Sequence, residues 1–403
     1  MNVLDNSALR ECTSCQLCGA VCPKEAIKIE LNRDGFYRPV VDGELCIDCG
    51  ICTKVCYRFD KHLLMSQDSD LEKYSLYAAW SKDDELVKQT TSGGIGDLLA
   101  RELISEGYKV VGVIYNDSKV RAEHVIAATE EETLPFRGSK YIQSYTLEAM
   151  KSVVKQCRDE KYAVFGTPCQ IYALSKLAEM KKVRENFFFV DLYCHGCPSV
   201  HIWKKYQDYV KKKLDIEHFD KVVFRSKIKG WGAFYVVIIE VDGKPVFKSN
   251  PKEDGFYELF FCDQVLNDGC LDCKLRSTLE YADIRLGDFW GKKFLNNHRG
   301  VSGVSLVTEQ GKDLFSRISQ KIENQQCGYS EFLPYQSWGR EYHPMLDARK
   351  DILESLQDDT QTIDDAVRAF RKYQSVTGKL KRLVKNVLYY LPIRCTTFLK
   401  RYA

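Results

Sequence analysis

The 403-residue sequence lacks the segments that would place a protein in a membrane or export it. No stretch reaches the roughly 18 consecutive apolar residues of a membrane-spanning helix, so we expect no transmembrane segment. The first ten residues have no positively charged start followed by an apolar core, which argues against a signal peptide. We therefore expect a cytoplasmic protein, in which cysteines stay reduced and oxygen-sensitive groups survive.

The sequence also lacks the common nucleotide-binding signatures. It contains neither a G-x-G-x-x-G fingerprint nor a Walker motif, which excludes the ordinary dinucleotide and P-loop sites. No nucleic-acid-binding module is recognisable, and we expect no nucleic-acid partner. Acidic residues are missing from one end: residues 366–403 carry ten Lys or Arg and no Asp or Glu, while the rest of the chain sums to −7.

Cysteine, by contrast, is abundant, with seventeen residues. Two runs share the spacing C-x2-C-x2-C-x3-C, and their members are Cys12, Cys15, Cys18 and Cys22, then Cys46, Cys49, Cys52 and Cys56. Three thiolates on a tight loop can hold three corners of an iron–sulfur cube, and in two-cluster ferredoxins the fourth cysteine of each run binds the other cluster. We therefore predict two [4Fe-4S] clusters, held by Cys12, Cys15, Cys18 and Cys56, and by Cys46, Cys49, Cys52 and Cys22. Zinc is the alternative, but it needs two C-x2-C pairs per ion rather than two triplets with a distant fourth ligand.

Between the two cysteine runs the pattern predicts a β-hairpin. Residues 27–31 alternate apolar and polar side chains, Asp34 and Gly35 can form a turn, and residues 36–41 return. The polar stretch 58–73 is typical of a linker. We thus expect a ferredoxin-like domain over residues 1–62.

After the linker, the sequence pattern predicts strands that alternate with helices. Residues 75–80 and 109–115 are predicted strands, and a Thr/Ser/Gly loop over residues 90–96 opens the helix between them. Backbone N–H groups at such a helix start could face a phosphate or a flavin edge, or the loop could simply cap the helix. The loop 134–144, which contains Ser139 and Lys140, could bind a phosphate or a carbonyl-rich ring, or could be an ordinary solvated loop.

Further cysteines follow two more predicted strands. Cys169 comes after the strand 162–165, and Cys194 comes after the strand 187–192. Parallel strands place such turns at one edge of the sheet, where open α/β folds bind ligands. Together with Cys270 and Cys273 these residues could hold a third cluster or a zinc ion. The additional cysteines Cys197 and Cys262 leave the ligand set open, and we expect Cys157, Cys327 and Cys395 to serve in packing.

Seven ordered motifs resemble the beta subunit of coenzyme F-420 (deazaflavin) hydrogenase/dehydrogenase, most closely bacterial members with a fused N-terminal ferredoxin. The motifs are T-S-G-G from Thr91, G-S-K-Y-I-Q-S from Gly138, G-T-P-C-Q from Gly166, C-H-G-C-P-S from Cys194, F-R-S-K-I-K-G-W from Phe224, C-L-D-C from Cys270 and D-I-R-L-G-D-F-W-G from Asp283. Cys197 departs from the pattern, where a small apolar residue is usual. The resemblance implies bound FAD, a [4Fe-4S] cluster beside it and a reducible substrate stacked on the flavin.

We therefore expect a multidomain α+β and α/β fold: the ferredoxin-like domain, an α/β flavin-binding catalytic region over residues 74–345, and a helical basic tail over residues 346–403. The expected function is an FAD-dependent oxidoreductase that passes electrons from a ferredoxin-type donor through three [4Fe-4S] clusters to a deazaflavin-like or other small organic substrate, because a flavin converts one-electron to two-electron chemistry. The alternatives are an electron-transfer subunit without its own substrate and a cluster-bearing scaffold or sensor. The expected FAD-binding residues are Thr91, Ser92, Gly93, Gly94, Ser139 and Lys140, and the candidate catalytic residues are Lys140, His195 and Arg225.

The basic tail adds one expectation about partners. Its apolar positions 380, 383, 384, 387, 388 and 391 fall on one face of a helix. This stripe could dock on an anionic membrane surface or an acidic protein, which would make the protein peripheral at the membrane. Alternatively, it could pack on the acidic body of the chain itself.

Overall fold

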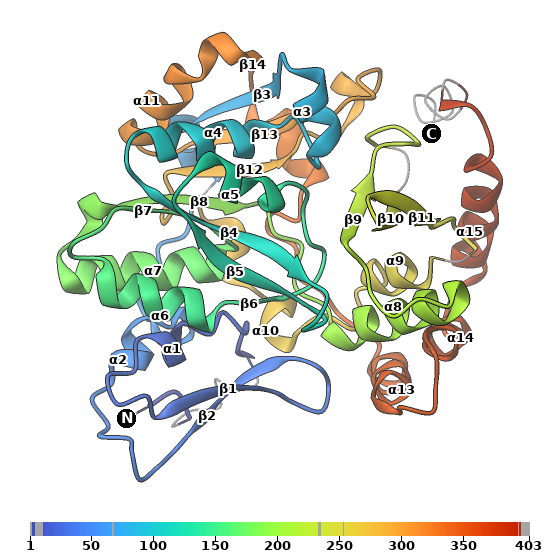
Figure 1. Cartoon of the computed structure of the whole chain (residues 1–403), viewed down its shortest axis with the longest axis horizontal. Helices are drawn as coiled ribbons and strands as arrows, with labels where there is room; N and C mark the ends of the chain where they lie inside the picture. Colours follow the sequence, from blue (N-terminus) through green and yellow to red (C-terminus); the bar gives the residue numbers. More distant parts are fainter. Residues whose placement is uncertain are drawn as a thin grey trace.

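The structure is a computed structural model that describes residues 2–4, 11–66, 68–232, 235–252, 254–393 and 395. The N-terminal region contains two short helices and the predicted hairpin, in the order α1 (Leu17–Ala20), β1 (Ile27–Leu31), β2 (Tyr37–Val41) and α2 (Ile51–Lys54). Strands β1 and β2 pair antiparallel, with Ile27 opposite Val41. The hairpin prediction is confirmed, and the region forms one end of the molecule (Figure 1).

A nine-stranded mixed sheet forms the centre of the molecule, in the order β14-β3-β13-β12-β8-β7-β4-β5-β6. The four strands β12, β8, β7 and β4 are parallel, and the flanking pairs β12–β13, β13–β3, β3–β14 and β4–β5 are antiparallel. The strands are β3 (Ser75–Ser81), β4 (Lys109–Asn116), β5 (Arg121–Ala127), β6 (Ser144–Tyr145), β7 (Tyr162–Phe165), β8 (Phe187–Leu192), β12 (Ile284–Asp288), β13 (Ser302–Leu306) and β14 (Ile322–Cys327).

Helices cover both faces of this sheet, which explains why its central strands are continuous apolar runs. Helices α4 (Ile95–Ser105) and α11 (Glu309–Arg317) share a buried core with one face, while α6 (Leu147–Gln156) and α7 (Pro168–Lys181) share a core with the other. Helix α1 of the N-terminal region joins the second core through Leu17. Shorter helices lie at the loops: α3 (Asp84–Gln89), α5 (Glu130–Thr133), α10 (Asp268–Leu271) and α12 (Tyr329–Phe332).

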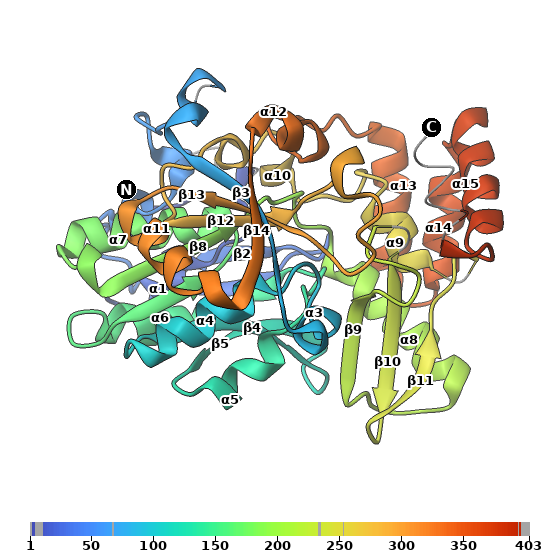
Figure 2. The same ribbon diagram turned by 90° about the horizontal axis from the view of Figure 1, so that it is seen from above.

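A second, smaller sheet is inserted between β8 and β12. It contains β9 (Lys221–Ser226), β10 (Val236–Val241) and β11 (Lys244–Lys248) in the order β11-β10-β9. Its core is shared with α8 (Val200–Leu214), α9 (Gly255–Phe260), α13 (Leu346–Gln357) and α14 (Ile363–Lys372). Figure 2 shows this unit at one side of the large sheet. Residues 233–234, just before β10, lie outside the described part of the chain.

The last described helix, α15 (Val376–Leu388), lies at the outer edge of the small unit in both views (Figures 1 and 2). Two side chains connect α15 to the small unit. Tyr389, directly after the helix, is buried beside Val236, and the Arg382 guanidinium lies 3.4 Å from the Glu258 carboxylate. None of the described helices is both long enough and apolar enough to cross a bilayer. The expected domain boundaries at 62, 74 and 345 stay predictions, although α13 and α14 share a core with residues 202–265.

Candidate functional site

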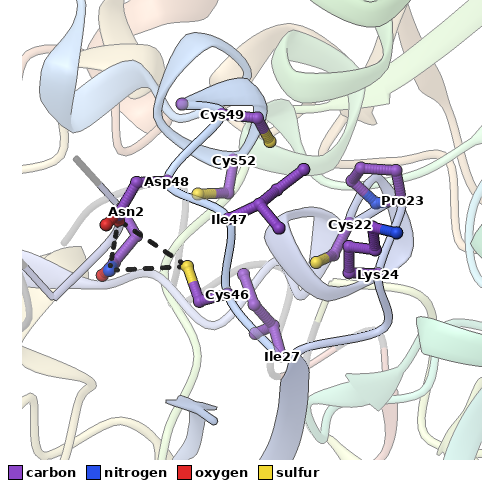
Figure 3. Close-up of a pocket in the computed structure, with 11 residues that line it drawn as sticks. Asn2, Cys22, Pro23, Lys24, Ile27, Cys46, Ile47, Asp48, Cys49 and Cys52 are labelled. Atoms are coloured by element: carbon purple, nitrogen blue, oxygen red, sulfur yellow. Dashed lines mark hydrogen bonds between the residues drawn. The ribbon is translucent and has the colours of Figure 1, made fainter. Parts of the chain in front are cut away.

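The cysteines of the two N-terminal runs line two pockets, and the last cysteine of each run lies in the pocket of the other run. One pocket encloses about 330 Å³ of empty space, including space open to solvent, and its cysteines are Cys22, Cys46, Cys49 and Cys52. Figure 3 shows these four side chains around Ile47, with Asn2 donating a hydrogen bond to the Cys46 sulfur over 3.8 Å. Cys22, from the first run, thus lies with three cysteines of the second.

The neighbouring pocket is the larger of the two, with about 530 Å³ of empty space, and its cysteines are Cys12, Cys15, Cys18 and Cys56. Here Cys56 has crossed from the second run to the first. Burial raises the pKa of the Cys15 and Cys18 thiols well above the usual range, and the neighbouring sulfurs add to the shift. Several buried thiolates in one pocket therefore need a cationic centre to be stable, which an iron–sulfur cluster would supply.

A third pocket lies at the carboxyl edge of the large sheet. About 350 Å³ of empty space is lined by five cysteines, which are Cys169, Cys194, Cys197, Cys270 and Cys273. The parallel strands β7 and β8 end just before Cys169 and Cys194, as the sequence predicted. Cys262 lies elsewhere: its thiol donates a hydrogen bond to the Leu259 carbonyl at 3.0 Å in the core of the small unit.

Each of the three pockets is lined by four or five cysteines. A four-cysteine zinc site draws its sulfurs around one ion at about 2.3 Å. Across the described residues, no group of three or more His, Cys, Asp or Glu side chains is arranged to hold one metal ion. Four cysteines in a pocket are also the ligand number of a [4Fe-4S] cluster.

The second and third pockets share one residue, and cysteines of neighbouring pockets lie close to each other, so the three pockets form a row. Thr13 lines both the Cys12 pocket and the third pocket. The Cys15 and Cys169 thiols, one from each of these pockets, are close enough to raise the pKa of Cys15. At the other end, Cys52 of the first pocket similarly raises the pKa of Cys18.

A missing side chain permits the close approach between the second and third pockets. A Cβ atom on Gly269, next to Cys270 in α10, would lie 2.2 Å from the Glu11 carbonyl oxygen and 2.7 Å from the Cys12 carbonyl carbon. Arg58 stabilises the same contact, because its guanidinium donates a hydrogen bond to the Gly269 carbonyl oxygen at 2.8 Å. Sequence reasoning missed both residues, because neither belongs to a recognisable ligand spacing.

Polar side chains on either side of β6 hold the segment before α1 in place. Gln143 donates to the Thr13 and Ser14 carbonyls at 3.2 Å, and the Thr146 hydroxyl donates to the Cys15 carbonyl at 3.0 Å. Residues in the G-S-K-Y-I-Q-S motif thus help to dock the ferredoxin-like region. The sequence had suggested a ligand-binding role for that motif as a whole.

The glycine-rich turn before α4 packs closely against the sheet. A Cβ on Gly93 would lie 2.4 Å from the Ala79 carbonyl oxygen of β3, and Gly94 has φ +84°, a conformation that favours glycine. Ser92 donates to the Val301 carbonyl at 2.8 Å. Packing therefore explains the absence of a side chain at Gly93, whether or not a ligand also approaches this turn.

The two predicted flavin-binding loops meet each other. The Ser139 N–H donates to the Thr91 hydroxyl at 2.6 Å. The Lys140 ammonium donates to the Pro135 and Arg137 carbonyls, and burial lowers its pKa to about 7. Lys227 donates to the Ser92 carbonyl beside this turn, and burial lowers its pKa to about 7 as well. Two lysines whose pKa is lowered by burial thus lie at these loops.

The remaining catalytic candidates lie in separate networks. Arg225 is buried and pairs with Asp288 at 2.6 Å, while its guanidinium lies 4.7 Å from the centroid of the Trp290 ring. It therefore links the small sheet to the end of β12. His195 lies beside the third pocket, with its Nδ1 2.9 Å from the Tyr342 hydroxyl and its Nε2 3.1 Å from the Asp263 carboxylate.

Comparison with protein families places these features in known groups. Residues 11–60 match the model of a 4Fe-4S dicluster domain. Residues 76–151 match the N-terminal model, and residues 159–327 the C-terminal model, of coenzyme F420 hydrogenase/dehydrogenase, beta subunit.

Individual relatives are 25% to 28% identical to this chain over the aligned residues. An uncharacterized protein of Methanocaldococcus jannaschii is 25% identical over 343 residues, which cover 76% of this chain and 86% of that protein. The coenzyme F420 hydrogenase subunit beta of Methanococcus voltae is 26% identical over 58% of this chain and 81% of its own length. The coenzyme F420-dependent sulfite reductase of Methanocaldococcus jannaschii is 28% identical over 77% of this chain, but only 46% of that protein is covered.

Among solved structures, a chain of the xenon-derivatised F420-reducing [NiFe] hydrogenase complex from Methanosarcina barkeri aligns with 79% of this chain and 96% of its own. The TM-score is 0.45, and the sequence identity is 21%.

Proposed function

The chain belongs to the coenzyme F420 hydrogenase/dehydrogenase beta subunit family, and from this premise we propose that it is an iron–sulfur flavoprotein oxidoreductase. Electrons would enter from a ferredoxin-type donor, pass through three [4Fe-4S] clusters and reach FAD, which would reduce a deazaflavin-like or other small organic substrate. The observation that carries the proposal is the row of three cysteine-lined pockets that runs from the N-terminal region to the carboxyl edge of the large sheet.

The chemistry of the donor sets supports the cluster assignment. Each N-terminal pocket contains four cysteines, three from one run and one from the other, as two-cluster ferredoxins require. For the third cluster we assign Cys169, Cys194, Cys270 and Cys273 as ligands. A hydrogen bond between the Cys197 and Cys270 side chains raises the pKa of Cys197 and lowers the pKa of Cys270, which suits a thiol donor beside a thiolate ligand.

The flavin assignment rests on the meeting of the two loops that match the family's motifs. We assign Thr91, Ser92, Gly93, Gly94, Ser139 and Lys140 to FAD. FAD, when bound, supplies the exchange between one-electron and two-electron chemistry. Burial disfavours the charged form of Lys140 and Lys227, and a bound phosphate or a reduced, anionic flavin ring would offset this by stabilising their ammonium groups.

A second candidate function is favoured by the relatives that are named as subunits of coenzyme F420 hydrogenase. In this case the chain would be an electron-transfer subunit of a larger assembly, with protein partners and no substrate of its own. Both functions use the same row of clusters. They differ in whether the isolated chain turns over a small molecule.

Anaerobic purification followed by cofactor analysis and a substrate screen tests the proposal. We expect FAD in acid extracts, and oxidation of chemically reduced ferredoxin that depends on an added deazaflavin or another small acceptor. Lys140→Met should lower FAD occupancy without lowering iron, with Lys212→Met at an exposed position of α8 as the matched control. Full FAD occupancy without turnover of any small acceptor would favour the subunit function, and the absence of FAD would refute the flavoprotein assignment.

A further inference from the structure

Helix α15 displays its apolar stripe to solvent instead of packing it on the chain. Leu380, Leu383 and Val387 are 60%, 57% and 64% exposed, and Val384 is 48% exposed. The sequence left open whether this stripe packs on the acidic body of the chain, and the structure shows that most of it does not. An exposed stripe of this kind marks an interaction site.

The opposite face of α15 attaches the helix to the body. Arg382 lies 3.4 Å from the Glu258 carboxylate and donates to Gln374 at 3.0 Å. Seven residues later, Tyr389 is buried and donates to the Ser249 carbonyl at 3.2 Å. Because residues seven apart lie on one side of a helix, these contacts fix the orientation of α15 with its apolar stripe outward.

The charge around the stripe has one sign. Lys379 and Lys381 are exposed on α15, and the sequence has no acidic residue beyond Asp365. Protein interfaces are usually depleted in lysine, whereas helices that lie in a lipid headgroup region combine a basic polar face with an apolar face. Lysine stems can cover apolar surface while their ammonium groups reach lipid phosphates. Tyr390, which is 63% exposed, can lie at the same level.

From these features we propose that α15 docks the protein on an anionic lipid surface. The stripe of Val376, Leu380, Leu383, Val384 and Val387 would enter the boundary between headgroups and acyl chains, and the flanking lysines would contact lipid phosphates. The N-terminal region with α1, β1, β2 and α2 lies on the far side of the molecule from α15 (Figure 1), so the bound protein would leave its proposed electron entry free.

Flotation of the full-length holoprotein with vesicles tests this proposal. We expect it to float with phosphatidylglycerol-rich vesicles, to float poorly with phosphatidylcholine vesicles, and to be released by high salt, which screens the lysine–phosphate attraction. The double variant Leu383→Glu, Val387→Glu should weaken vesicle binding by about tenfold or more, because it removes apolar contact and adds repulsion from the lipid charge.

Controls separate a lipid-binding defect from misfolding and from a protein interface. Val246→Glu, a matched change at a residue of β11 that is 41% exposed, should leave flotation unchanged. The double variant should keep the iron content and unfolding temperature of the parent, because its residues are exposed. The proposal is wrong if the parent does not float, if the double variant floats as well as the parent, or if the parent is a dimer in solution that the double variant converts to monomers.

Discussion

The two cysteines of the turn after β8 have different chemical surroundings. Cys197 shares a hydrogen bond with Cys270, while burial raises the pKa of Cys194 to about 12. A ligand thiolate gains stability from iron, whereas a neighbouring thiol can donate a hydrogen bond to a ligand sulfur and so tune the potential of the cluster. The sequence alone could not distinguish these roles, because both cysteines lie in one short motif.

This difference predicts opposite effects of two substitutions. Cys194→Ser should lower iron by about a third, in line with the loss of one cluster out of three. Cys197→Ala should keep the iron and make the midpoint potential of the third cluster more negative, because the reduced cluster loses a hydrogen bond to sulfur. Iron analysis and an EPR-monitored redox titration measure both effects. If Cys197→Ala loses iron and Cys194→Ser keeps it, then Cys197 is the cluster ligand and the assignment of Cys194 is wrong.

Gly269 provides a test of the contact between the second and third pockets. In Gly269→Ala the added Cβ would overlap the backbone of Glu11 and Cys12, and overpacking of this kind costs about 1–3 kcal/mol. We expect full iron content but slower reduction of the third cluster by reduced ferredoxin. Stopped-flow absorbance measures the rate of this reduction. Gly43→Ala is the matched control, because no atom lies within 4 Å of its added Cβ. An unchanged rate would show that this close approach does not limit electron transfer.

At the scale of elements, the sequence predicted those that have a clear local pattern. The hairpin β1–β2 followed from alternation and a turn, and β3, β4, β7 and β8 followed from short apolar runs between polar loops. Strand β11 could not be predicted in this way, because it is short, charged and mostly exposed. The whole small unit was missed as a separate core, since its residues come from α8 to α9 and again from α13 and α14.

Tertiary contacts also give several motif residues a packing role that the sequence did not indicate. Arg225 was a catalytic candidate from its motif, but the structure places it in a buried pair with Asp288 between two sheets. Gly93 was assigned to flavin from its place before a helix, while the backbone of β3 already requires glycine there. A sequence pattern indicates that a residue is constrained, and only the packing shows which neighbour imposes the constraint.

Helix α9 begins at Asp254, whose protonation should make the free energy of unfolding depend on pH. Asp254 accepts a hydrogen bond from the Tyr257 N–H at 3.2 Å, and burial raises its pKa to about 7. An unfolded Asp titrates near about 3.9, so the folded state binds more protons between these pH values, and stability falls as pH rises from about 4 to about 7. This single group should lower the free energy of unfolding by up to about 1.4 kcal/mol per pH unit.

Asp254→Asn keeps a helix-capping oxygen and removes the titration. We expect the variant to lose this part of the pH dependence and to be more stable than the parent at neutral pH. Anaerobic urea unfolding across this pH range measures the effect. Asp313→Asn, at an exposed position of α11, is the control. A parent and a variant with parallel pH profiles would show that the Asp254 carboxyl is already charged in the fold.

At the scale of the whole molecule, the row of pockets predicts a direction for electrons. The N-terminal region, whose cysteines line two pockets, lies at one end of the molecule (Figure 1), and the predicted flavin loops connect elements of the large sheet. In the variant Cys12→Ser, Cys46→Ser, turnover driven by reduced ferredoxin should be lost, while dithionite should still reduce bound FAD. Assays with the two reductants side by side measure this, and unchanged ferredoxin-driven turnover would refute the relay.

The number of irons per chain tests the central claim most directly. Three [4Fe-4S] clusters predict about twelve irons and about twelve acid-labile sulfides in protein purified without oxygen. The variant Cys270→Ser, Cys273→Ser should fall to about eight of each while the EPR signals of the two N-terminal clusters persist. A parent protein with about eight irons and one zinc ion would contradict the account, because the third pocket would then hold no cluster.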